Sequence, residues 1–241
     1  MRRAALELLE YMKFSKEYKK FKPYTMINSR WFRENLILAN SALSDPSLKD
    51  GVVIECGTWK GGMAAALVEL GGPTRKYYFF DSFEGLPPAD PIDGKSAQDY
   101  QANTSDPGYR DNCRASIDDL KAALALTQCS SSQFEIIPGF FENSFPNFEP
   151  PNIALLRLDA DWYSSTMLCL RKFWSHVMPG GMILIDDYFT WDGCAKAVHE
   201  FLAETEATER VQQGRIAGTA FIQRQFPTGT WRNFMLERRP N

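Results

Sequence analysis

A glycine-rich turn between an apolar run and a helical pattern constrains the fold of this chain more than any other stretch. Residues 51–63 read GVVIECGTWKGGM, and the helix-forming sequence AAALVEL continues from there. A short continuous apolar run is typical of a buried parallel strand. Glycines let a ligand approach the backbone, and the N-terminus of the following helix offers free N–H groups. The order strand, turn, helix predicts an open α/β sheet with a ligand at its edge.

The acid in this turn distinguishes it from a dinucleotide fingerprint. The glycines follow the spacing G-x-x-x-G-G instead of G-x-G-x-x-G, and Glu55 precedes the first of them by two residues. An acid would repel phosphates, but it suits a positively charged ligand such as the amino acid part of S-adenosylmethionine (SAM). A tight turn without a ligand is the alternative. The residues of this turn that we expect to bind SAM are Glu55, Gly57, Thr58 and Gly61.

A second acid follows at the end of the next predicted strand. The sequence KYYFF at 76–80 is a strong strand pattern that ends in Asp81. In doubly wound folds, a carboxylate at the end of the second strand binds ribose hydroxyls. We therefore expect Asp81 and Ser82 to hold the ribose, with a helix cap or a surface acid as the alternative. The other predicted cofactor contacts are Met26, Gly139 and Phe140.

Length and composition fit one large α/β domain with a helical extension. The chain has 241 residues, of which 44% are hydrophobic and 13% aromatic, enough for a full core. A net charge of -3 and a pI of about 5.5 argue against a nucleic-acid partner. The five cysteines lack C-x-x-C spacing, which favours a reducing cytoplasm over disulfides. We expect no signal peptide and no membrane span.

The pattern along the chain predicts two parts. Residues 1–50 form an N-terminal helical extension, which would cover a cofactor or provide a homo-oligomer interface. Residues 51–241 form the domain that we expect to bind SAM. Within it, residues 84–110 are rich in Pro, Asp, Gly and Ser, and we interpret them as a lid over the substrate. The other predicted elements are helices at 3–14, 29–44, 112–126, 164–177 and 192–203, strands at 134–138, 153–158 and 182–185, and antiparallel edge strands around 219–223 and 233–236.

Two neighbouring predicted strands each end in a pair of aspartates. These four residues are Asp159, Asp161, Asp186 and Asp187. The carboxyl ends of parallel strands meet at one edge of a sheet, so the four should converge near Glu55. Carboxylates that converge without Lys or Arg partners repel each other, and a hard divalent cation removes that repulsion. Oxygen ligands favour Mg²⁺, Mn²⁺ or Ca²⁺. Helix capping by Asp161 and Asp187 is the alternative.

Five stretches taken together resemble the macrocin-type O-methyltransferases. In order and spacing they are ECGTWKGG, FDSFEGLP, LRLDADWYSST, PGGMILIDDY and GCAKAV. The resemblance implies a Rossmann-like class I methyltransferase fold, with a mostly parallel sheet and a terminal antiparallel hairpin. It also implies metal-dependent methylation of sugar hydroxyls by SAM. By the same resemblance, the metal ligands are Asp159, Asp186 and Asp187, and the SAM-binding acids are Glu55 and Asp81.

The predicted reaction is methyl transfer from SAM to a hydroxyl of a small-molecule acceptor, a sugar or diol of a natural product or glycoside. The metal would hold the acceptor oxygen and lower its pKa, and Asp159 would accept the proton. Two other functions remain open: a catechol-type enzyme that methylates a phenolic diol, and a non-catalytic SAM-binding module of a biosynthetic assembly. The glycine spacing disfavours an NAD-linked oxidoreductase.

Overall fold

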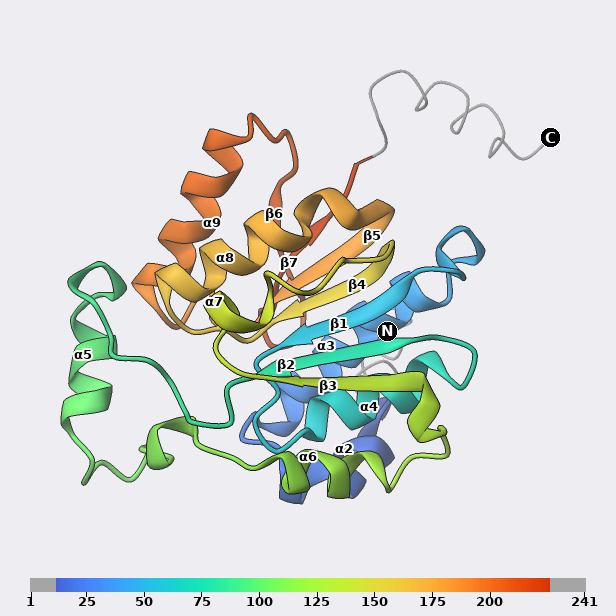
Figure 1. The fold of residues 1–241 in the computed structure, drawn as a ribbon, viewed down its shortest axis with the longest axis horizontal. Helices are drawn as coiled ribbons and strands as arrows, with labels where there is room; N and C mark the ends of the chain where they lie inside the picture. Colours follow the sequence, from blue (N-terminus) through green and yellow to red (C-terminus); the bar gives the residue numbers. More distant parts are fainter. Residues whose placement is uncertain (1–11, 226–241) are drawn as a thin grey trace, which may run out of the picture.

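The computed structural model describes residues 12–225. Within them, a seven-stranded sheet of order β3-β2-β1-β4-β5-β7-β6 carries helices on both faces (Figure 1). The strands β3, β2, β1, β4 and β5 are parallel, whereas β7 is antiparallel to both β5 and β6. The predicted mostly parallel sheet with a terminal antiparallel hairpin is therefore confirmed. The strands are β1 (Val52–Cys56), β2 (Tyr77–Asp81), β3 (Phe134–Pro138), β4 (Ile153–Leu158), β5 (Val177–Ile185), β6 (Val211–Gln213) and β7 (Ala220–Gln223).

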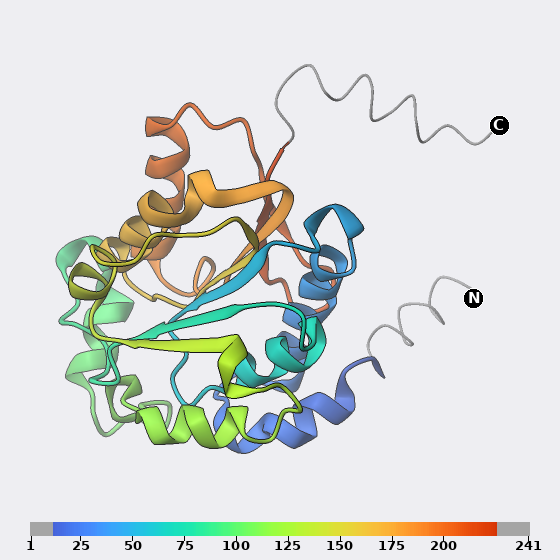
Figure 2. The same ribbon diagram turned by 45° about the vertical axis from the view of Figure 1, so that its right-hand side comes forward.

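The helices form one layer on each face of the sheet, except for α5 (Lys95–Ala102), which lies apart from both layers (Figure 1). The others are α2 (Ser15–Phe21), α3 (Ser29–Leu43), α4 (Gly62–Gly71), α6 (Ile117–Leu124), α7 (Phe141–Ser144), α8 (Tyr163–Phe173) and α9 (Asp192–Glu204). Single 3-10 turns are Lys22–Tyr24, Pro46–Leu48, Pro91–Asp93, Asp111–Cys113, Ser131–Gln133 and Trp174–His176. Helices α7, α8 and α9 cover one face, and α2, α3, α4 and α6 cover the other (Figures 1 and 2). Among residues 12–225, no helix combines the length and apolar character needed to cross a bilayer.

The central strands face both helical layers and therefore have two apolar sides. Every residue of β1 and β4 is buried. Successive side chains of a strand point to opposite faces, so Ile54 joins the core under α8 and α9, whereas Val53 joins the core under α3 and α4. This two-sided burial explains why the strands read as continuous apolar runs.

Several predicted elements have different bounds in the structure. The helix predicted at 164–177 is α8, which ends at Phe173. Strand β5 begins at Val177 instead of the predicted 182. The Pro-Gly-Gly sequence that was expected to precede the strand is part of it, and Gly180 adopts a positive φ of 85° there. The helix predicted at 112–126 starts only at Ile117, because Asp111–Cys113 form a turn with positive φ angles. Ser116 then caps the helix in a reciprocal hydrogen-bonding arrangement with Asp119.

The remaining differences concern the two ends of the chain. Strand β6 was not predicted, and it supplies the hairpin partner of β7. The predicted strand around 233–236 lies outside the described residues, as does nearly all of the helix predicted at 3–14. The second predicted N-terminal helix is confirmed as α3.

The predicted lid, residues 84–110, contains helix α5 and is tied to the body of the domain. Asp93 is 3% exposed, and its Oδ1 accepts a hydrogen bond of 2.7 Å from the backbone N–H of Tyr163, the first residue of α8. Gln101 on α5 donates to Asn112 Oδ1 at 2.9 Å, beyond the end of the segment. The segment is thus fastened at its middle and at α5, and its role as a lid stays a prediction.

Candidate active site

The candidate site lies where the strand order reverses, between β1 and β4. Open α/β sheets bind ligands outside the carboxyl ends of the strands at such a point. A cavity of 360 Å³ opens here. The predicted site residues that line it are Met26, Glu55, Gly57, Thr58, Asp81, Ser82, Phe140, Asp159, Asp186 and Asp187. Gly61 and Gly139 are not among its lining residues.

The two predicted ligand-binding glycines of the first turn have different structural roles. Both have a φ of +83°. A Cβ at Gly57 would lie 1.8 Å from the backbone oxygen of Asp159, whereas a Cβ at Gly61 would lie 2.3 Å from Cδ1 of Leu120 on α6. Gly57 therefore lets the turns after β1 and β4 approach each other at the cavity. Gly61 lets α4 pack closely against α6.

Gly57→Ala is expected to lower the free energy of unfolding by about 3 kcal/mol. Left-handed backbone costs a residue with a Cβ about 1–2 kcal/mol, and steric overlap in a packed site adds about 1–3 kcal/mol. Gly72→Ala is the matched control, because Gly72 has a φ of +75° and a Cβ added there would meet nothing within 4 Å. Urea denaturation measures both variants. Equal destabilisation of the two would show that the close approach to Asp159 does not matter.

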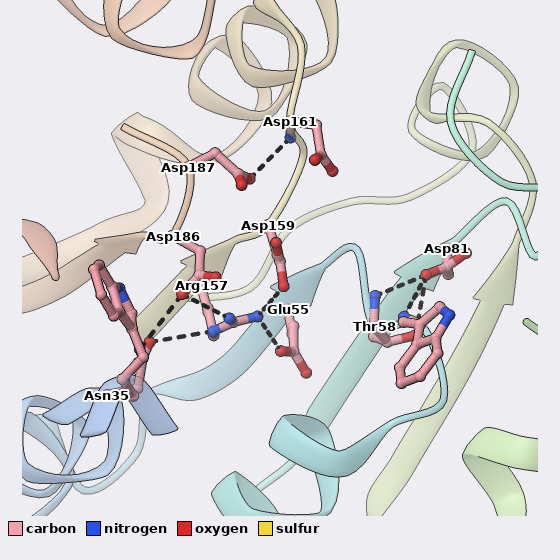
Figure 3. Close-up of polar contacts among 11 residues, drawn as sticks. Asn35, Glu55, Thr58, Asp81, Arg157, Asp159, Asp161, Asp186 and Asp187 are labelled. Carbon is pink, nitrogen blue, oxygen red and sulfur yellow. Dashed lines mark hydrogen bonds and ion pairs between the residues drawn. The ribbon is translucent and has the colours of Figure 1, made fainter. Parts of the chain in front are cut away.

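Asp81, the predicted ribose ligand, holds the backbone of two turns. Its Oδ2 accepts hydrogen bonds from the N–H groups of Thr58 and Trp59, both at 2.8 Å (Figure 3). Its Oδ1 accepts one from the N–H of Phe83 at 2.7 Å. Trp59 and Phe83 have φ angles of 47° and 58°, so the carboxylate stabilises conformations that these residues rarely adopt. Burial raises the pKa of Asp81, against the effect of these donors. Ribose binding by Asp81 stays a prediction.

A buried arginine connects the acids at the ends of three strands. Arg157 Nη1 lies 2.7 Å from Glu55 Oε1 and 2.9 Å from Asp159 Oδ2, and Nη2 lies 2.9 Å from Asp186 Oδ1 (Figure 3). Its Nε donates to Asn35 Oδ1 at 3.2 Å, and Asn35 Nδ2 donates to Asp186 at 3.4 Å. The side chains of Arg157 and Glu55 are both 1% exposed. This network brings α3, β1, β4 and the end of β5 together.

The prediction that the acids converge without a Lys or Arg partner is therefore wrong. Arg157 interrupts the apolar run IALLRL of β4, in which all residues are buried. Arginine is almost never fully buried unless it is paired. An arginine within this apolar run therefore indicates, from the sequence alone, a buried acidic partner. The parallel register aligns Arg157 with Glu55 on β1. Burial raises the pKa of Glu55 to about 8, although Arg157 acts in the opposite direction.

Three aspartates form a compact group beside this network. Asp159, Asp161 and Asp187 each offer a carboxylate oxygen, and these oxygens lie within 4.8 Å of one another. We call these residues the acid group. The backbone N–H of Asp161 donates to Asp187 Oδ2 at 3.0 Å, which joins the loop after β4 to the loop after β5 (Figure 3). Asp186, which the resemblance places among the metal ligands, pairs with Arg157 and lies outside the acid group.

Helix capping does not explain these acids. The N-cap residues of α8 and α9 are Trp162 and Trp191, and neither helix has a side-chain cap hydrogen bond at that position. Asp187 instead accepts from the backbone of Asp161, and Asp161 Oδ1 accepts from the indole N–H of Trp191 at 3.0 Å. The capping alternative is therefore wrong for both residues.

The acid group suits a hard divalent cation in its donor set and charge. All its donor atoms are carboxylate oxygens, which Mg²⁺, Mn²⁺ and Ca²⁺ prefer. Burial, together with the negative charge of neighbouring aspartates, holds the pKa of Asp161 and that of Asp187 well above the ordinary value. A positive charge among these oxygens would relieve that repulsion.

Solved structures share this architecture. The O-methyltransferase NovP superposes with a TM-score of 0.69 at 22% identity, covering 84% of this chain and 83% of that one. The calicheamicin methyltransferase CalS11 gives a TM-score of 0.59 at 22% identity, with 78% of each chain covered. A sheet of this strand order, with a ligand cavity at the β1–β4 reversal, defines the class I methyltransferase fold. The chain belongs to the macrocin O-methyltransferase (TylF) family, whose model matches residues 19–223.

Curated relatives of the chain are O-methyltransferases by name. One is the 8-demethyl-8-(2,3-dimethoxy-alpha-L-rhamnosyl)-tetracenomycin-C 4'-O-methyltransferase of Streptomyces olivaceus, 30% identical over 161 residues, with 64% of this chain and 60% of the relative covered. Another is the mycinamicin III 3''-O-methyltransferase of Micromonospora griseorubida, 30% identical over 171 residues, with 65% and 63% covered. The chain thus spans less than two thirds of the length of either relative.

Proposed function

We propose that this protein transfers a methyl group from SAM to a hydroxyl of a sugar or diol on a natural product or glycoside, with the help of a divalent metal ion. The observation that carries the proposal is the acid group, which shares one cavity with the predicted SAM-binding residues. Membership of the macrocin O-methyltransferase family supports the transfer of methyl to oxygen. The rhamnosyl group in the name of one relative supports a sugar acceptor.

The cofactor would occupy the side of the cavity formed by β1 and β2. Glu55 Oε2 is buried there and has no hydrogen-bond partner among the described residues. An unpaired buried carboxylate oxygen is costly, so a ligand with a positively charged amino group would satisfy it. SAM carries such a group. Met26 and Phe140 add apolar surface to the same cavity.

The metal would be held by the acid group, Asp159, Asp161 and Asp187, with Asp186 beside it. A divalent cation at these oxygens supplies positive charge that lowers the pKa of an acceptor hydroxyl. The chain's own contribution is to place the acceptor oxygen in line with the methyl carbon and the sulfur of SAM.

Two members of the acid group are candidates for the general base. Asp159 was predicted from its position after β4, and its Oδ2 lies 2.9 Å from Arg157 Nη1. Asp161 Oδ1 accepts a hydrogen bond from the indole N–H of Trp191, which is a neutral donor and not an arginine. We keep Asp159 as the proposed base. Asp161 is its rival, because the described ion pairs of Arg157 include Asp159 and do not include Asp161.

A methyl-transfer assay tests the proposal. The purified protein is incubated with SAM labelled in its methyl group, with Mg²⁺ or with a chelator, and with a panel of glycosides and catechols. We expect labelled glycoside in the presence of Mg²⁺ and at least a hundredfold less with the chelator, since charge stabilisation at the reacting centre is worth about 10²–10³-fold. Methylation of catechols alone would favour the phenolic alternative. SAM binding without turnover would favour the non-catalytic module.

A further inference from the structure

Aromatic rings from two distant segments form part of the cavity on the acid-group side. Tyr100 comes from α5 and Trp191 from the residue before α9; both are half-buried, and both line the cavity. Their ring centroids lie 5.8 Å apart. Trp191 follows β5, whereas the predicted SAM-binding acids lie at the carboxyl ends of β1 and β2 across the sheet. We call Tyr100 and Trp191 the aromatic wall.

The rings of the aromatic wall are held by their surroundings. Trp162, which is fully buried, packs edge-on against Trp191 with ring centroids 5.3 Å apart and an interplanar angle of 68°. The indole N–H of Trp162 donates to the backbone oxygen of Pro87 at 2.9 Å. Tyr100 packs against Tyr109 at a centroid distance of 5.3 Å. A surface fixed in this way loses little conformational entropy when a ligand binds to it.

Trp191 is also bonded to two of the three members of the acid group. Its indole N–H donates to Asp161 Oδ1 at 3.0 Å, and its backbone N–H donates to the carbonyl oxygen of Asp187 at 3.0 Å. An indole N–H can only donate, so this contact fixes which oxygen of Asp161 points toward Trp191. The other oxygen remains for the space shared with Asp159 and Asp187. The side chain of Trp191 thus orients the Asp161 carboxylate and also forms part of the cavity wall on the acid-group side.

We propose that Trp191 is a positioning residue for Asp161 and that the aromatic wall receives the pyranose ring of the acceptor. The inference rests on the proposed function, and it names the acceptor class and the residue that recognises it. The face of an aromatic ring carries partial negative charge. A pyranose ring offers C–H groups on its faces and hydroxyls at its edge. A pyranose packed on the wall therefore places an edge hydroxyl near Asp161.

The positioning role is tested by Mn²⁺ binding, measured by calorimetry on the full chain without an acceptor. Trp191→Phe keeps an aromatic ring but removes the N–H donor. Loss of a hydrogen-bond partner behind a metal ligand typically weakens metal affinity about 10–100-fold, and we expect about tenfold here. Trp174→Phe is the matched control, because Trp174 packs against Phe201 and is not among the cavity-lining residues. Equal Mn²⁺ affinity of Trp191→Phe and wild type would overturn the positioning role.

The wall is tested by saturation-transfer NMR with methyl α-L-rhamnopyranoside, which detects weak binding without turnover. Wild type and Trp191→Phe should transfer saturation to the ring C–H protons of the sugar, whereas Trp191→Leu should lose most of the signal. Circular dichroism shows whether each variant is folded. Undiminished transfer in folded Trp191→Leu would overturn the wall.

These measurements separate the inference from the proposed function. A wild-type protein that binds Mn²⁺ and the pyranoside as expected, but transfers no methyl group, would refute the proposed function, whereas the roles of Trp191 in Mn²⁺ binding and in pyranoside binding would still hold. A protein that methylates glycosides while Trp191→Phe and Trp191→Leu behave as wild type would refute the inference alone. Wild-type protein that binds neither Mn²⁺ nor the pyranoside would overturn the inference.

Discussion

Replacing Arg157 with methionine is expected to lower the free energy of unfolding by about 3–5 kcal/mol, the usual result of removing one partner of a buried ion pair. Methionine fills a similar volume but leaves Glu55, which is fully buried, and Asp186 without their cation. Arg171→Met is the matched control. Arg171 pairs with Glu204 at 3.0 Å on the surface, with side chains 58% and 52% exposed, so its loss should cost less than about 1 kcal/mol.

Urea denaturation in the presence of a chelator measures both variants. The free energy of unfolding of Arg157→Met should rise as the pH falls from 8 toward 5. Burial already raises the pKa of Glu55 to about 8 in the native protein, and loss of the arginine raises it further. The folded state then binds more protons than the unfolded state above pH ~4, so stability falls as pH rises. An Arg157→Met variant as stable as Arg171→Met would show that Arg157 is not needed to hold the acids.

Changing the general base to asparagine is expected to reduce turnover by about 10²–10⁴-fold, and excess Mg²⁺ should not restore it. Asparagine keeps one oxygen ligand but cannot accept the proton. The variants to compare are Asp159→Asn, Asp161→Asn, Asp186→Asn and Asp187→Asn. Those that only hold the metal should need more Mg²⁺ and regain part of their activity at high concentration. SAM affinity, measured by calorimetry, should stay near the wild-type value in all four.

A Mg²⁺ titration of turnover identifies the base among these variants. If Asp161→Asn alone resists rescue, Asp161 is the base and the assignment of Asp159 is wrong. If both Asp159→Asn and Asp161→Asn recover with Mg²⁺, neither is the base. Asp118→Asn is the control for loss of one negative charge, because the Asp118 side chain on α6 is 95% exposed. Wild-type turnover that persists in chelator would contradict the metal itself.

The elements that local sequence determines were predicted closely. Strands β3 and β4 have the predicted bounds, because each is a short apolar run bounded by polar or turn-forming residues. Helix α3 follows from its apolar spacing and begins after Asn28, whose side chain caps it. The helix within the predicted lid was not recognised. Its sequence, KSAQDYQA, buries only Ala97 and so lacks an apolar face.

The contacts within the site depend on partners far apart in the chain. Sequence order placed the acids at one sheet edge, and the structure confirms that Glu55, Asp159 and Asp186 meet there. Their shared cation was missed, because Arg157 and Glu55 are 102 residues apart and only the β1–β4 register pairs them. Trp191 was missed for the same reason. Tryptophan side chains are common in protein cores, and only the hydrogen bond from Trp191 to Asp161 indicates a role in the site.

The network around Arg157 divides the residues of this protein into those that tolerate substitution and those that do not. Asn35 on α3 is bonded to both Arg157 and Asp186, so the chemistry of the site depends on four elements that must change together. Tyr100 lies in residues 84–110, a segment without any described hydrogen bond or ion pair to Arg157. Engineers who seek new acceptors would therefore vary residues 84–110 and leave α3 and the strand ends untouched. Natural diversification of acceptor choice would have followed the same division, since loops tolerate substitution better than the scaffold that positions them.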